Sequence, residues 1–176
     1  MAILETSTKR LLALDLALCL RIHAAAGAAS RRFFGVVSRL GDGWLWLAVT
    51  AALPVVHGPG AWPVVFELLV TAGLAMGLYK TLKRGTARPR PCAVAESLQE
   101  VTPALDVYSF PSGHTLHAVA FTVVVAGQLG GWAWVLVPFT ILVACSRVVL
   151  GLHYPTDVVA GAALGAVVGA AGSLVT

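Results

Sequence analysis

Long apolar runs separated by short polar segments set the pattern of this chain. Four of these runs contain about 18 to 22 residues each, the length at which an α-helix crosses the hydrocarbon layer of a bilayer; they are residues 61–82, 112–129, 132–150 and 156–175. A weaker run, residues 44–56, is short for a crossing and contains Pro54, so it needs tilt or local thinning of the bilayer. The pattern predicts an all-α polytopic membrane bundle with about five crossing helices.

The first apolar stretch, residues 11–22, carries a polar stripe. Asp15, Cys19 and His23 recur at i, i+4 and i+8, so on a helix they line up opposite a leucine-rich surface. This amphipathic pattern predicts a helix in the membrane interface, and a spanning sixth helix is the alternative. A signal peptide is a further alternative, which the charged side chains of Asp15 and Arg21 disfavour.

The direction of the helices brings the polar segments to one membrane face. If residues 61–82 end on that face, the long connection 83–110 lies there, residues 112–129 leave it and residues 132–150 return to it. The chain then turns near His153 and leaves again. We therefore expect one integral membrane domain, with an N-terminal helix and connector in residues 1–43, a bundle in 44–176 and a functional loop in 83–110.

Composition supports the membrane assignment. The chain of 176 residues is 58% hydrophobic and only 11% charged, whereas about 25% of the residues in a soluble domain are charged. Apart from Arg147, all basic residues precede residue 91, so they do not form the extended exposed face that nucleic-acid binding requires. The cysteines are odd in number and lack the spacing of a disulfide framework or a metal site; they are Cys19, Cys92 and Cys145.

Small residues form a contact face along residues 156–175. Gly161, Gly165 and Gly169 recur every four residues, a spacing that lets another helix approach closely. We expect this face to make a contact inside the bundle, and a homodimer contact is the alternative.

Cations cluster beside the apolar runs. Lys83, Arg88 and Arg90 occupy the segment KRGTARPRP, and Arg147 lies near the end of a later run. Such a density of cations beside a bilayer indicates an anionic ligand, and phosphate fits because guanidinium groups bind its oxygens in pairs. Ordinary positive flanks of membrane segments are the alternative, but the alternating prolines of the segment hold its backbone extended and stiff.

The segment Pro111-Ser112-Gly113-His114 begins the next apolar run. Ser112 is a favourable N-cap, and Gly113 lets backbone N–H groups approach a ligand closely. A phosphate could therefore bind at this helix N-terminus. A turn with a helix cap is the alternative when the Pro-Ser-Gly sequence is considered alone.

A second histidine lies four residues before a carboxylate. Pro155 stands between His153 and Asp157, so His153 belongs to a turn and Asp157 to the first turn of the last helix. The carboxylate can orient the imidazole through one ring nitrogen and leave the other free to attack phosphorus. Because His114 and the cations are expected on the same face, these residues together indicate phosphoryl-transfer chemistry.

Three motifs in this order resemble the signature of the type 2 phosphatidic acid phosphatase superfamily, which includes lipid phosphate phosphatases and vanadium-dependent haloperoxidases. The motifs are Lys83-x6-Arg90-Pro91, Pro111-Ser112-Gly113-His114 and Ser146-Arg147-x5-His153-x3-Asp157. The resemblance covers about residues 61–175, with all internal spacings matched, and extends more loosely to residues 39–43, Arg39-Leu40-Gly41-Asp42-Gly43. It implies an integral membrane phosphatase.

The resemblance also implies a role for each motif residue. His153 would be the nucleophile that forms a phosphohistidine, Asp157 would orient it, and His114 would protonate the leaving oxygen and later help to activate water. The phosphoryl oxygens would be bound by Lys83, Arg90 and Arg147, assisted by Ser112 and the Gly113 backbone, with Arg88 as a further candidate. We expect no metal ion and no cofactor, since cationic side chains take the metal's role.

The resemblance implies an amphiphilic substrate, such as undecaprenyl diphosphate, phosphatidic acid or phosphatidylglycerophosphate, in contact with membrane lipids. Lipid phosphotransfer to an alcohol is one alternative. A non-catalytic lipid-phosphate binder or transporter is another, which the presence of His114, His153 and Asp157 disfavours. Haloperoxidase activity is not expected, because that branch is soluble.

The basic residues also predict an orientation in a bacterial cytoplasmic membrane. The loops on the far side, near residues 57–63 and 129–132, contain no Lys or Arg, whereas Arg31, Arg32 and Arg39 lie on the side of the cationic segments. The positive-inside rule then places the catalytic face in the cytoplasm. Bacterial relatives with a site that faces outward leave the opposite orientation open.

Overall fold

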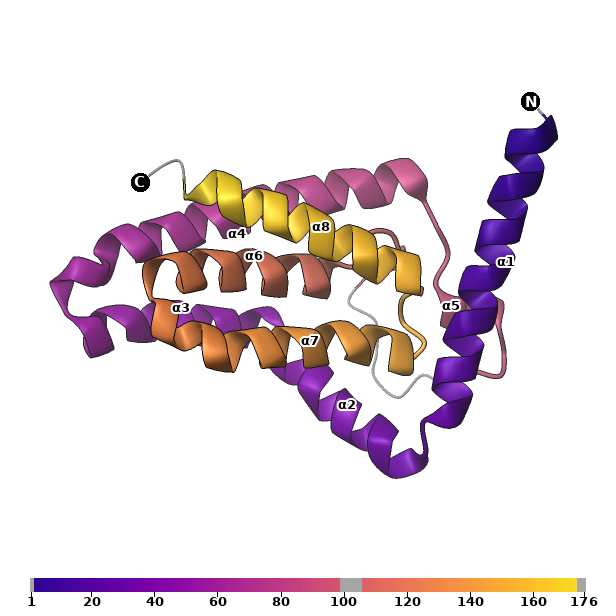
Figure 1. Cartoon of the computed structure of the whole chain (residues 1–176), viewed down its shortest axis with the longest axis horizontal. Coiled ribbons are helices and arrows are strands. Elements are labelled where there is room, and N and C mark those ends of the chain that lie inside the picture. Colours follow the sequence, from indigo (N-terminus) through magenta and orange to yellow (C-terminus); the bar gives the residue numbers. More distant parts are fainter. Residues whose placement is uncertain (1, 99–105, 174–176) are drawn as a thin grey trace.

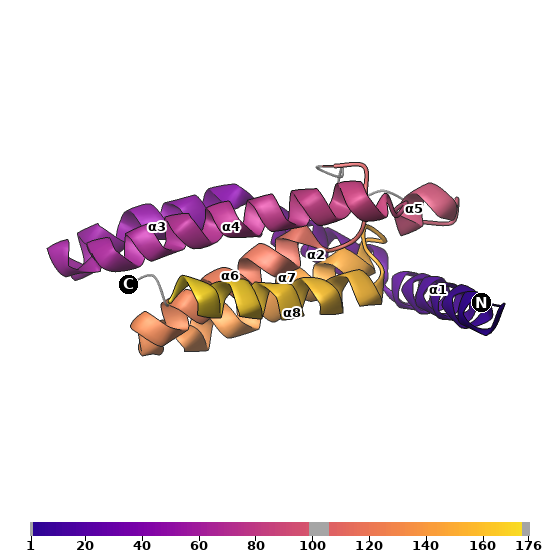
Figure 2. The same ribbon diagram turned by 90° about the horizontal axis from the view of Figure 1, so that it is seen from above.

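The computed structural model describes residues 2–98 and 106–173, which are helical apart from turns and the loop around α5. Helices α3, α4, α6, α7 and α8 run side by side, and α1 stands steeply across one end of this bundle (Figures 1 and 2). The helix bounds are α1 Ala2–Ala25, α2 Ala28–Leu40, α3 Gly43–His57, α4 Trp62–Thr86, α5 Pro91–Val94, α6 Gly113–Gln128, α7 Ala133–Val149 and α8 Pro155–Gly172, with short 3-10 turns at Pro59–Ala61 and Gly130–Trp132. The prediction of an all-α membrane bundle is confirmed for the described residues.

The candidate membrane spans are fewer than the crossings expected. Three stretches among the described residues are long and apolar enough to cross a bilayer, namely Pro59–Thr86, Gly130–Val149 and Pro155–Gly172. Arg10–Ala25 and Ala28–Leu40 would add a fourth if this pair, bent by 112°, forms one broken span. The other two expected crossings, α3 and α6, have 15 and 16 residues, so their ends must lie closer to the bilayer centre or the bilayer must thin around them.

The N-terminal part contains a second helix where a connector was expected, and the polar stripe of its first helix faces the protein. Residues 28–40 form helix α2, because their apolar and basic side chains recur with the spacing of a helix and gather on different faces. The stripe of α1 that holds Asp15, Cys19 and His23 is buried against the bundle, whereas Leu14 and Leu18 are exposed. A helix lying free in the interface would turn this stripe toward water. The stripe is buried instead because its polar groups find partners inside the protein, such as the Val149 carbonyl, which accepts a 2.9 Å hydrogen bond from His23 Nδ1.

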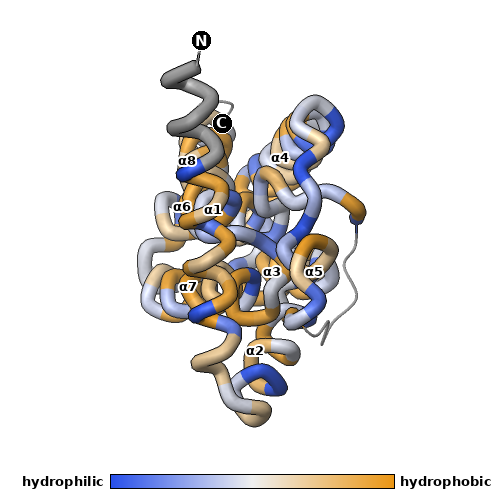
Figure 3. Tube along the Cα trace, turned by 90° about the vertical axis from the view of Figure 1, so that its right-hand side faces the viewer, coloured by the Kyte–Doolittle hydropathy of each residue, from blue (hydrophilic) through white to orange (hydrophobic). Residues whose placement is uncertain are grey.

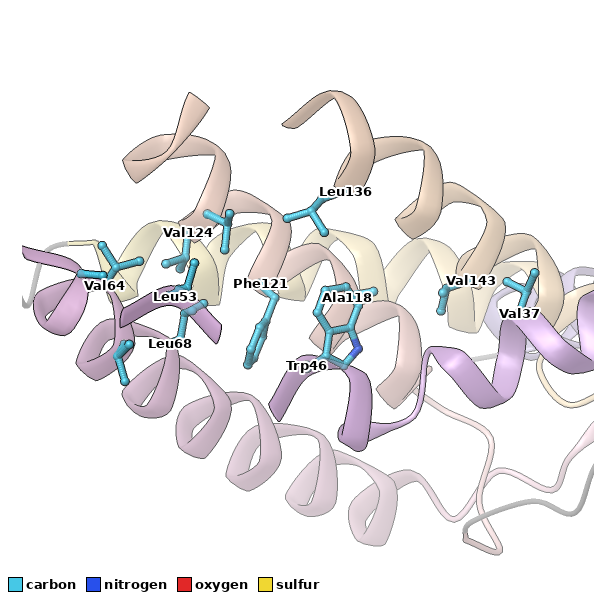
Figure 4. Close-up of a cluster of buried hydrophobic side chains, with 13 residues drawn as sticks. Val37, Trp46, Leu53, Val64, Leu68, Ala118, Phe121, Val124, Leu136 and Val143 are labelled. Atoms are coloured by element: carbon cyan, nitrogen blue, oxygen red, sulfur yellow. The ribbon is translucent and has the colours of Figure 1, made fainter. Parts of the chain in front are cut away.

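The apolar core lies between α3, α4, α6 and α7 (Figure 4). Trp46 of α3 is 3% exposed and packs against Phe121 and Phe139, with ring centroids 5.4 and 6.0 Å apart. Aromatic contacts of this kind add about 0.5–1.5 kcal/mol each beyond the burial of area. A hydrogen bond of 2.7 Å between the hydroxyl groups of Thr122 and Thr140 joins α6 to α7 within the core. These contacts fix the helices that carry the polar segments.

The glycines of α8 bring it into close contact with α6. A Cβ atom at Gly161 would lie 2.6 Å from the Ser112 carbonyl oxygen, and one at Gly165 would lie 2.5 Å from the Leu116 carbonyl oxygen. At the end of this contact, the Ser112 N–H donates a 3.0 Å hydrogen bond to the Asp157 carbonyl. The expected contact inside the bundle is therefore confirmed, and this face is covered by the chain itself rather than available for a homodimer.

Candidate active site

A cavity of about 600 Å³ opens at the end of the bundle where α4, α6, α7 and α8 bring the polar segments together. Its polar wall contains the side chains of Lys83, Arg90, His114, Arg147 and His153. Figure 3 looks onto this end and shows hydrophilic positions where α4 finishes and the chain continues to α5. Segments separated by as many as 70 positions in sequence thus share one cavity, as helix direction predicted.

The turn between α7 and α8 places His153 in the wall of the cavity. Gly151 has a φ of 68°, a left-handed conformation that glycine adopts without strain, and it lets the chain reverse direction after α7. The N–H groups of Leu152 and His153 both donate 3.0 Å hydrogen bonds to the carbonyl of Arg147. The candidate nucleophile and a candidate phosphate ligand are therefore fixed to each other through the backbone.

The contacts of His153 indicate which ring nitrogen carries the proton. Nε2 lies 3.1 Å from Arg90 Nη1, and because a guanidinium only donates, Nε2 must accept this hydrogen bond with a free lone pair. The proton then resides on Nδ1, which lies 3.5 Å from Asp157 Oδ2, within ion-pair range but longer than a normal hydrogen bond. Burial, followed by the charges of Arg147 and Arg90, lowers the pKa of His153 well below 6.5. His153 is therefore neutral near pH 7, and Nε2 can act as a nucleophile once Arg90 donates to a phosphate instead.

Asp157 is fully buried behind His153, in the first turn of α8. Its Oδ2 accepts a 2.9 Å hydrogen bond from the backbone N–H of Tyr154, and its Oδ1 accepts one of 2.8 Å from Arg88 Nη1. These bonds hold the carboxylate so that one oxygen faces the imidazole. The structure thus places Asp157 beside His153, 3.5 Å from Nδ1, and the predicted orienting hydrogen bond is not formed among the described residues.

His114 has a carboxylate partner that the motifs did not reveal. The imidazole lies in the first turn of α6, and its Nε2 donates a 2.6 Å hydrogen bond to Oδ1 of Asp42, just before α3. Both residues line the cavity. Asp42 occupies the N-cap position of α3 but makes no capping hydrogen bond with its side chain, which is instead used by His114. In the sequence, Asp42 lies in the turn Gly41-Asp42-Gly43, within the segment to which the family resemblance extends loosely, but no residue there was assigned a role.

Lys83 and Arg90 share a counterion in the cavity. Asp106 accepts hydrogen bonds of 2.7 Å from Lys83 Nζ and 2.6 Å from Arg90 Nη2 through the same oxygen, Oδ1. Burial alone would raise the pKa of Asp106, but the hydrogen bond and charge of Lys83, assisted by Arg90, lower it. A carboxylate with two bound cations resembles in charge and geometry the phosphate oxygens that these cations are expected to bind.

Helix α2, near the N-terminus, contacts the side chain of Arg147. Arg147 is 2% exposed, and its Nη1 donates a hydrogen bond to the hydroxyl group of Ser38 in α2. Among the described residues, its Nε has no hydrogen-bond partner. Arg147 also lines the cavity, so its guanidinium is placed to bind an anionic oxygen there.

Two of the expected phosphate ligands do not reach the cavity. The Ser112 side chain lies within the first turn of α6, where its Oγ is 3.0 Å from the Thr115 hydroxyl, so it serves as a helix cap. Arg88 points away from the cavity and pairs with Asp15 and Asp157 at 2.7 and 2.8 Å. Gly113, in contrast, lines the cavity, as expected for a backbone contact.

The cavity continues from its charged end into an apolar part between α3, α4 and α6. Its wall there contains Trp46, Thr50, Ala72, Met76 and Phe121. These side chains belong to the bundle rather than to the loops at its end. The cavity can therefore contact an anionic group and an apolar chain of the same ligand.

Comparisons with known proteins agree with this geometry. An undecaprenyl-diphosphatase from Sulfolobus acidocaldarius is 31% identical over 130 residues, which cover 73% of this chain and 62% of that protein. A decaprenylphosphoryl-5-phosphoribose phosphatase from Mycolicibacterium smegmatis is 38% identical over 154 residues, which cover 86% of this chain and 78% of that protein. The chain thus spans less than two thirds of the first of these relatives.

The fold is also found in a solved structure. The crystal structure of a transmembrane PAP2-type phosphatidylglycerolphosphate phosphatase from Bacillus subtilis superposes with a TM-score of 0.80 at 21% identity, covering 94% of this chain and 86% of that one. A family model described as the PAP2 superfamily matches residues 64–176. Since this match includes more than half of the chain and all three motifs, the chain belongs to the PAP2 superfamily.

Proposed function

We propose that this protein is a membrane-integral phosphatase that removes the terminal phosphate of a lipid phosphate or polyprenyl diphosphate through a phosphohistidine intermediate. One observation carries the proposal: the unprotonated Nε2 of His153 lies in the wall of a cavity that also presents Lys83, Arg90 and Arg147. Its lone pair accepts a hydrogen bond from Arg90, which a phosphate bound to Arg90 would release. A nucleophile beside three cations is the arrangement that phosphoryl transfer requires.

In the first step, His153 Nε2 attacks phosphorus while the bond from phosphorus to the leaving oxygen breaks. His114 donates a proton to that oxygen, and the cations stabilise the negative charge spread over the phosphoryl oxygens. As positive charge develops on the imidazole, Nδ1–H donates a hydrogen bond to Asp157 Oδ2 and keeps its proton. The products of this step are the free lipid alcohol or lipid monophosphate and a phosphohistidine.

In the second step, water attacks the phosphohistidine and the phosphorus–nitrogen bond breaks. His114, now deprotonated, accepts a proton from the water, and Asp42 fixes the imidazole through the 2.6 Å hydrogen bond. Inorganic phosphate leaves, and His153 returns to its neutral form. The positive charges for both steps come from side chains, so we expect turnover to continue in excess chelator after dialysis.

The apolar part of the cavity supports an amphiphilic substrate. A lipid tail between α3 and α4 would contact Trp46 and Met76 while its phosphate reaches the cations. The names of the relatives, an undecaprenyl-diphosphatase and a decaprenylphosphoryl-5-phosphoribose phosphatase, agree with a polyprenyl substrate. Phosphatidic acid and phosphatidylglycerophosphate meet the same chemical requirements.

The test is phosphate release by the purified protein in detergent from undecaprenyl diphosphate, phosphatidic acid, phosphatidylglycerophosphate and a soluble ester. We expect turnover of at least one lipid, with a loss of at least about 1000-fold in His153→Ala and His114→Ala. His57→Ala is the matched control, because His57 lies at the C-terminal end of α3, away from the cavity. Wild-type turnover by His153→Ala would reject the nucleophile, and lipid binding without turnover in the unaltered protein would identify a binder or transporter. Transfer of phosphate to an added alcohol without release would identify a phosphotransferase.

We further propose that the catalytic end of the bundle faces the cytoplasm of a bacterial cell. Arg31, Arg32 and Arg39 belong to α2, which reaches this end and holds Arg147 through Ser38. The test uses Glu96→Cys, an exposed position, after replacement of the three native cysteines, and an impermeant thiol reagent. Labelling only after the membrane is opened is expected; labelling of intact spheroplasts would reverse the orientation.

A further inference from the structure

The N-terminal helix α1 contacts the segment that carries Asp157, the carboxylate beside His153. Asp15 of α1 is 5% exposed, and its Oδ2 accepts a 2.7 Å hydrogen bond from Arg88 Nη2. Its Oδ1 accepts a 3.1 Å hydrogen bond from the backbone N–H of Thr156, in the first turn of α8, and the Thr156 hydroxyl donates to Oδ2. Asp15 is therefore fully engaged with the segment that carries Asp157.

Arg88 joins Asp15 to Asp157 with opposite ends of its guanidinium. Nη2 donates to Asp15, while Nη1 donates to Asp157 Oδ1 at 2.8 Å and to the Thr156 hydroxyl at 2.9 Å. The guanidinium also lies over the ring of Tyr154, 3.8 Å from its centroid. These contacts fix the plane of the guanidinium and, through it, the plane of the Asp157 carboxylate.

The rest of the polar stripe of α1 contacts the same segment. Cys19 Sγ lies 3.8 Å from the carbonyl of His153, and His23 Nδ1 donates to the carbonyl of Val149. Three successive turns of α1 thus rest on residues 149–156, from the end of α7 to the start of α8. The polar stripe of α1 is buried because its side chains contact the backbone of residues 149–156.

We propose that Asp15 and Arg88 are positioning residues that set the orientation and the effective charge of Asp157 toward His153. This proposal rests on the phosphatase function proposed above. Arg88 alone would neutralise Asp157, because one cation would face one carboxylate. With Asp15 on its other side, the three groups together carry one negative charge, part of which remains available to stabilise the positive charge that develops on His153 during attack.

Charge removal at Asp15 separates this role from simple capping of α8. Asp15→Asn keeps oxygen and nitrogen near Thr156 and Arg88 but removes the negative charge. We expect kcat to fall about tenfold with KM within about twofold, because the cations that bind the phosphate are untouched. Asp15→Glu is expected to recover part of the rate. Arg21→Gln is the matched control, since Arg21 is exposed on the same helix.

Two further readouts distinguish positioning from structure. With p-nitrophenyl phosphate, the acidic limb of the kcat/KM profile is expected to move to lower pH in Asp15→Asn, because loss of a nearby negative charge disfavours protonated His153. In an Asp157→Asn background, Asp15→Asn is expected to have no further effect on kcat, because Asp15 acts through Asp157. Thermal unfolding in detergent identifies variants that fail to fold. If Asp15→Asn fails to fold, Arg88→Lys serves as the second variant, because it keeps the positive charge but cannot contact both carboxylates. Arg88→Lys is also expected to lower kcat about tenfold.

The outcomes are distinct from those that test the phosphatase function itself. An unchanged kcat in folded Asp15→Asn, or an unchanged rate in folded Arg88→Lys, would overturn the positioning proposal while His153→Ala remained inactive. An equal loss from Asp15→Asn in the presence and absence of the Asp157 carboxylate would also overturn it. Wild-type turnover by His153→Ala would instead reject the function on which the proposal rests.

Discussion

At the scale of single residues, charge balance in the cavity is the main feature. Lys83 and Arg90 share the carboxylate of Asp106, which is 37% exposed at its side chain and can move away when a phosphate arrives. An incoming phosphate must replace this carboxylate, because both ligands need the same donors. Asp106 is therefore expected to weaken the binding of small anions and to favour substrates whose tails contribute binding of their own.

Substitution of Asp106 tests this competition. Asp106→Asn is expected to lower the inhibition constant of inorganic phosphate about tenfold, because the like-charge competitor is removed. The measurement is inhibition of lipid hydrolysis by phosphate at fixed ionic strength. Glu96→Gln is the control, an exposed carboxylate in the same loop. Weaker phosphate inhibition in Asp106→Asn would show that this carboxylate positions the cations instead.

The protonation state of His153 predicts the acidic limit of activity. Burial and the neighbouring arginines lower the pKa of His153 below 6.5, so the neutral nucleophile persists as the pH falls through 6.5 and is lost only at a more acidic pH. With p-nitrophenyl phosphate, whose leaving group needs no proton, the acidic limb of kcat/KM is expected below pH 6.5, after correction for substrate ionisation. A limb at or above 6.5 would contradict this environment for His153.

At the scale of helices, the contact between α6 and α8 determines where the two histidines stand. The close approach at Gly161 and Gly165 brings the first turns of both helices together, and the Ser112 N–H then meets the Asp157 carbonyl at 3.0 Å. Side chains larger than hydrogen at these glycines would separate the helices. The geometry of the site therefore depends on positions that carry no chemistry.

Gly165→Ala tests the importance of this contact. Its Cβ would lie 2.5 Å from a backbone carbonyl that cannot rotate away, so we expect the free energy of unfolding to fall by about 1–3 kcal/mol and activity to fall with it. The measurement is thermal unfolding in detergent. Gly127→Ala is the matched control on α6, since nothing lies within 4 Å of a Cβ there, and it is expected to be neutral or stabilising. Equal stability of the two variants would show that the contact between α6 and α8 does not depend on glycine at position 165.

The same scale shows which features the sequence could predict. Motif spacing and helix direction were sufficient to bring Lys83, Arg90, His114, Arg147 and His153 to one cavity, because each lies at or beside the end of an apolar run. Helical periodicity could show that α1 has a polar stripe but not that the stripe faces protein, since water and a polar protein surface satisfy the same groups.

Pairings across long sequence distances could not be predicted from one sequence. Asp42 and His114 are separated by 72 positions, and Asp15 and Arg88 by 73. No periodicity relates residues in different helices, so only the packing of α1 and α3 against the bundle selects these partners. The sequence made Arg88 a candidate phosphate ligand, whereas the packing of α1 pairs it with Asp15. The part of the loop in residues 99–105 lies outside the described residues.

At the scale of the whole molecule, the fold joins an apolar environment and a charged one in a single cavity. Apolar helices line the part of the cavity that would hold a lipid tail under the proposed function, and their ends bring cations and histidines to one surface. Helix α1 crosses this surface and contacts the turn that carries His153 (Figure 1). The proposed function requires a covalent bond between His153 and the phosphoryl group.

The most direct test is a search for that covalent intermediate with p-nitrophenyl [32P]phosphate. In His114→Ala, the first step needs no acid with this leaving group, but activation of water is lost, so labelled protein is expected to accumulate. The label should be labile to acid, stable to alkali and located on His153. The double variant His114→Ala/His153→Ala should carry no label, and His57→Ala should behave like the unaltered protein. Release of labelled phosphate by the unaltered protein, without labelled protein at early times in either the unaltered protein or His114→Ala, would contradict a phosphohistidine intermediate.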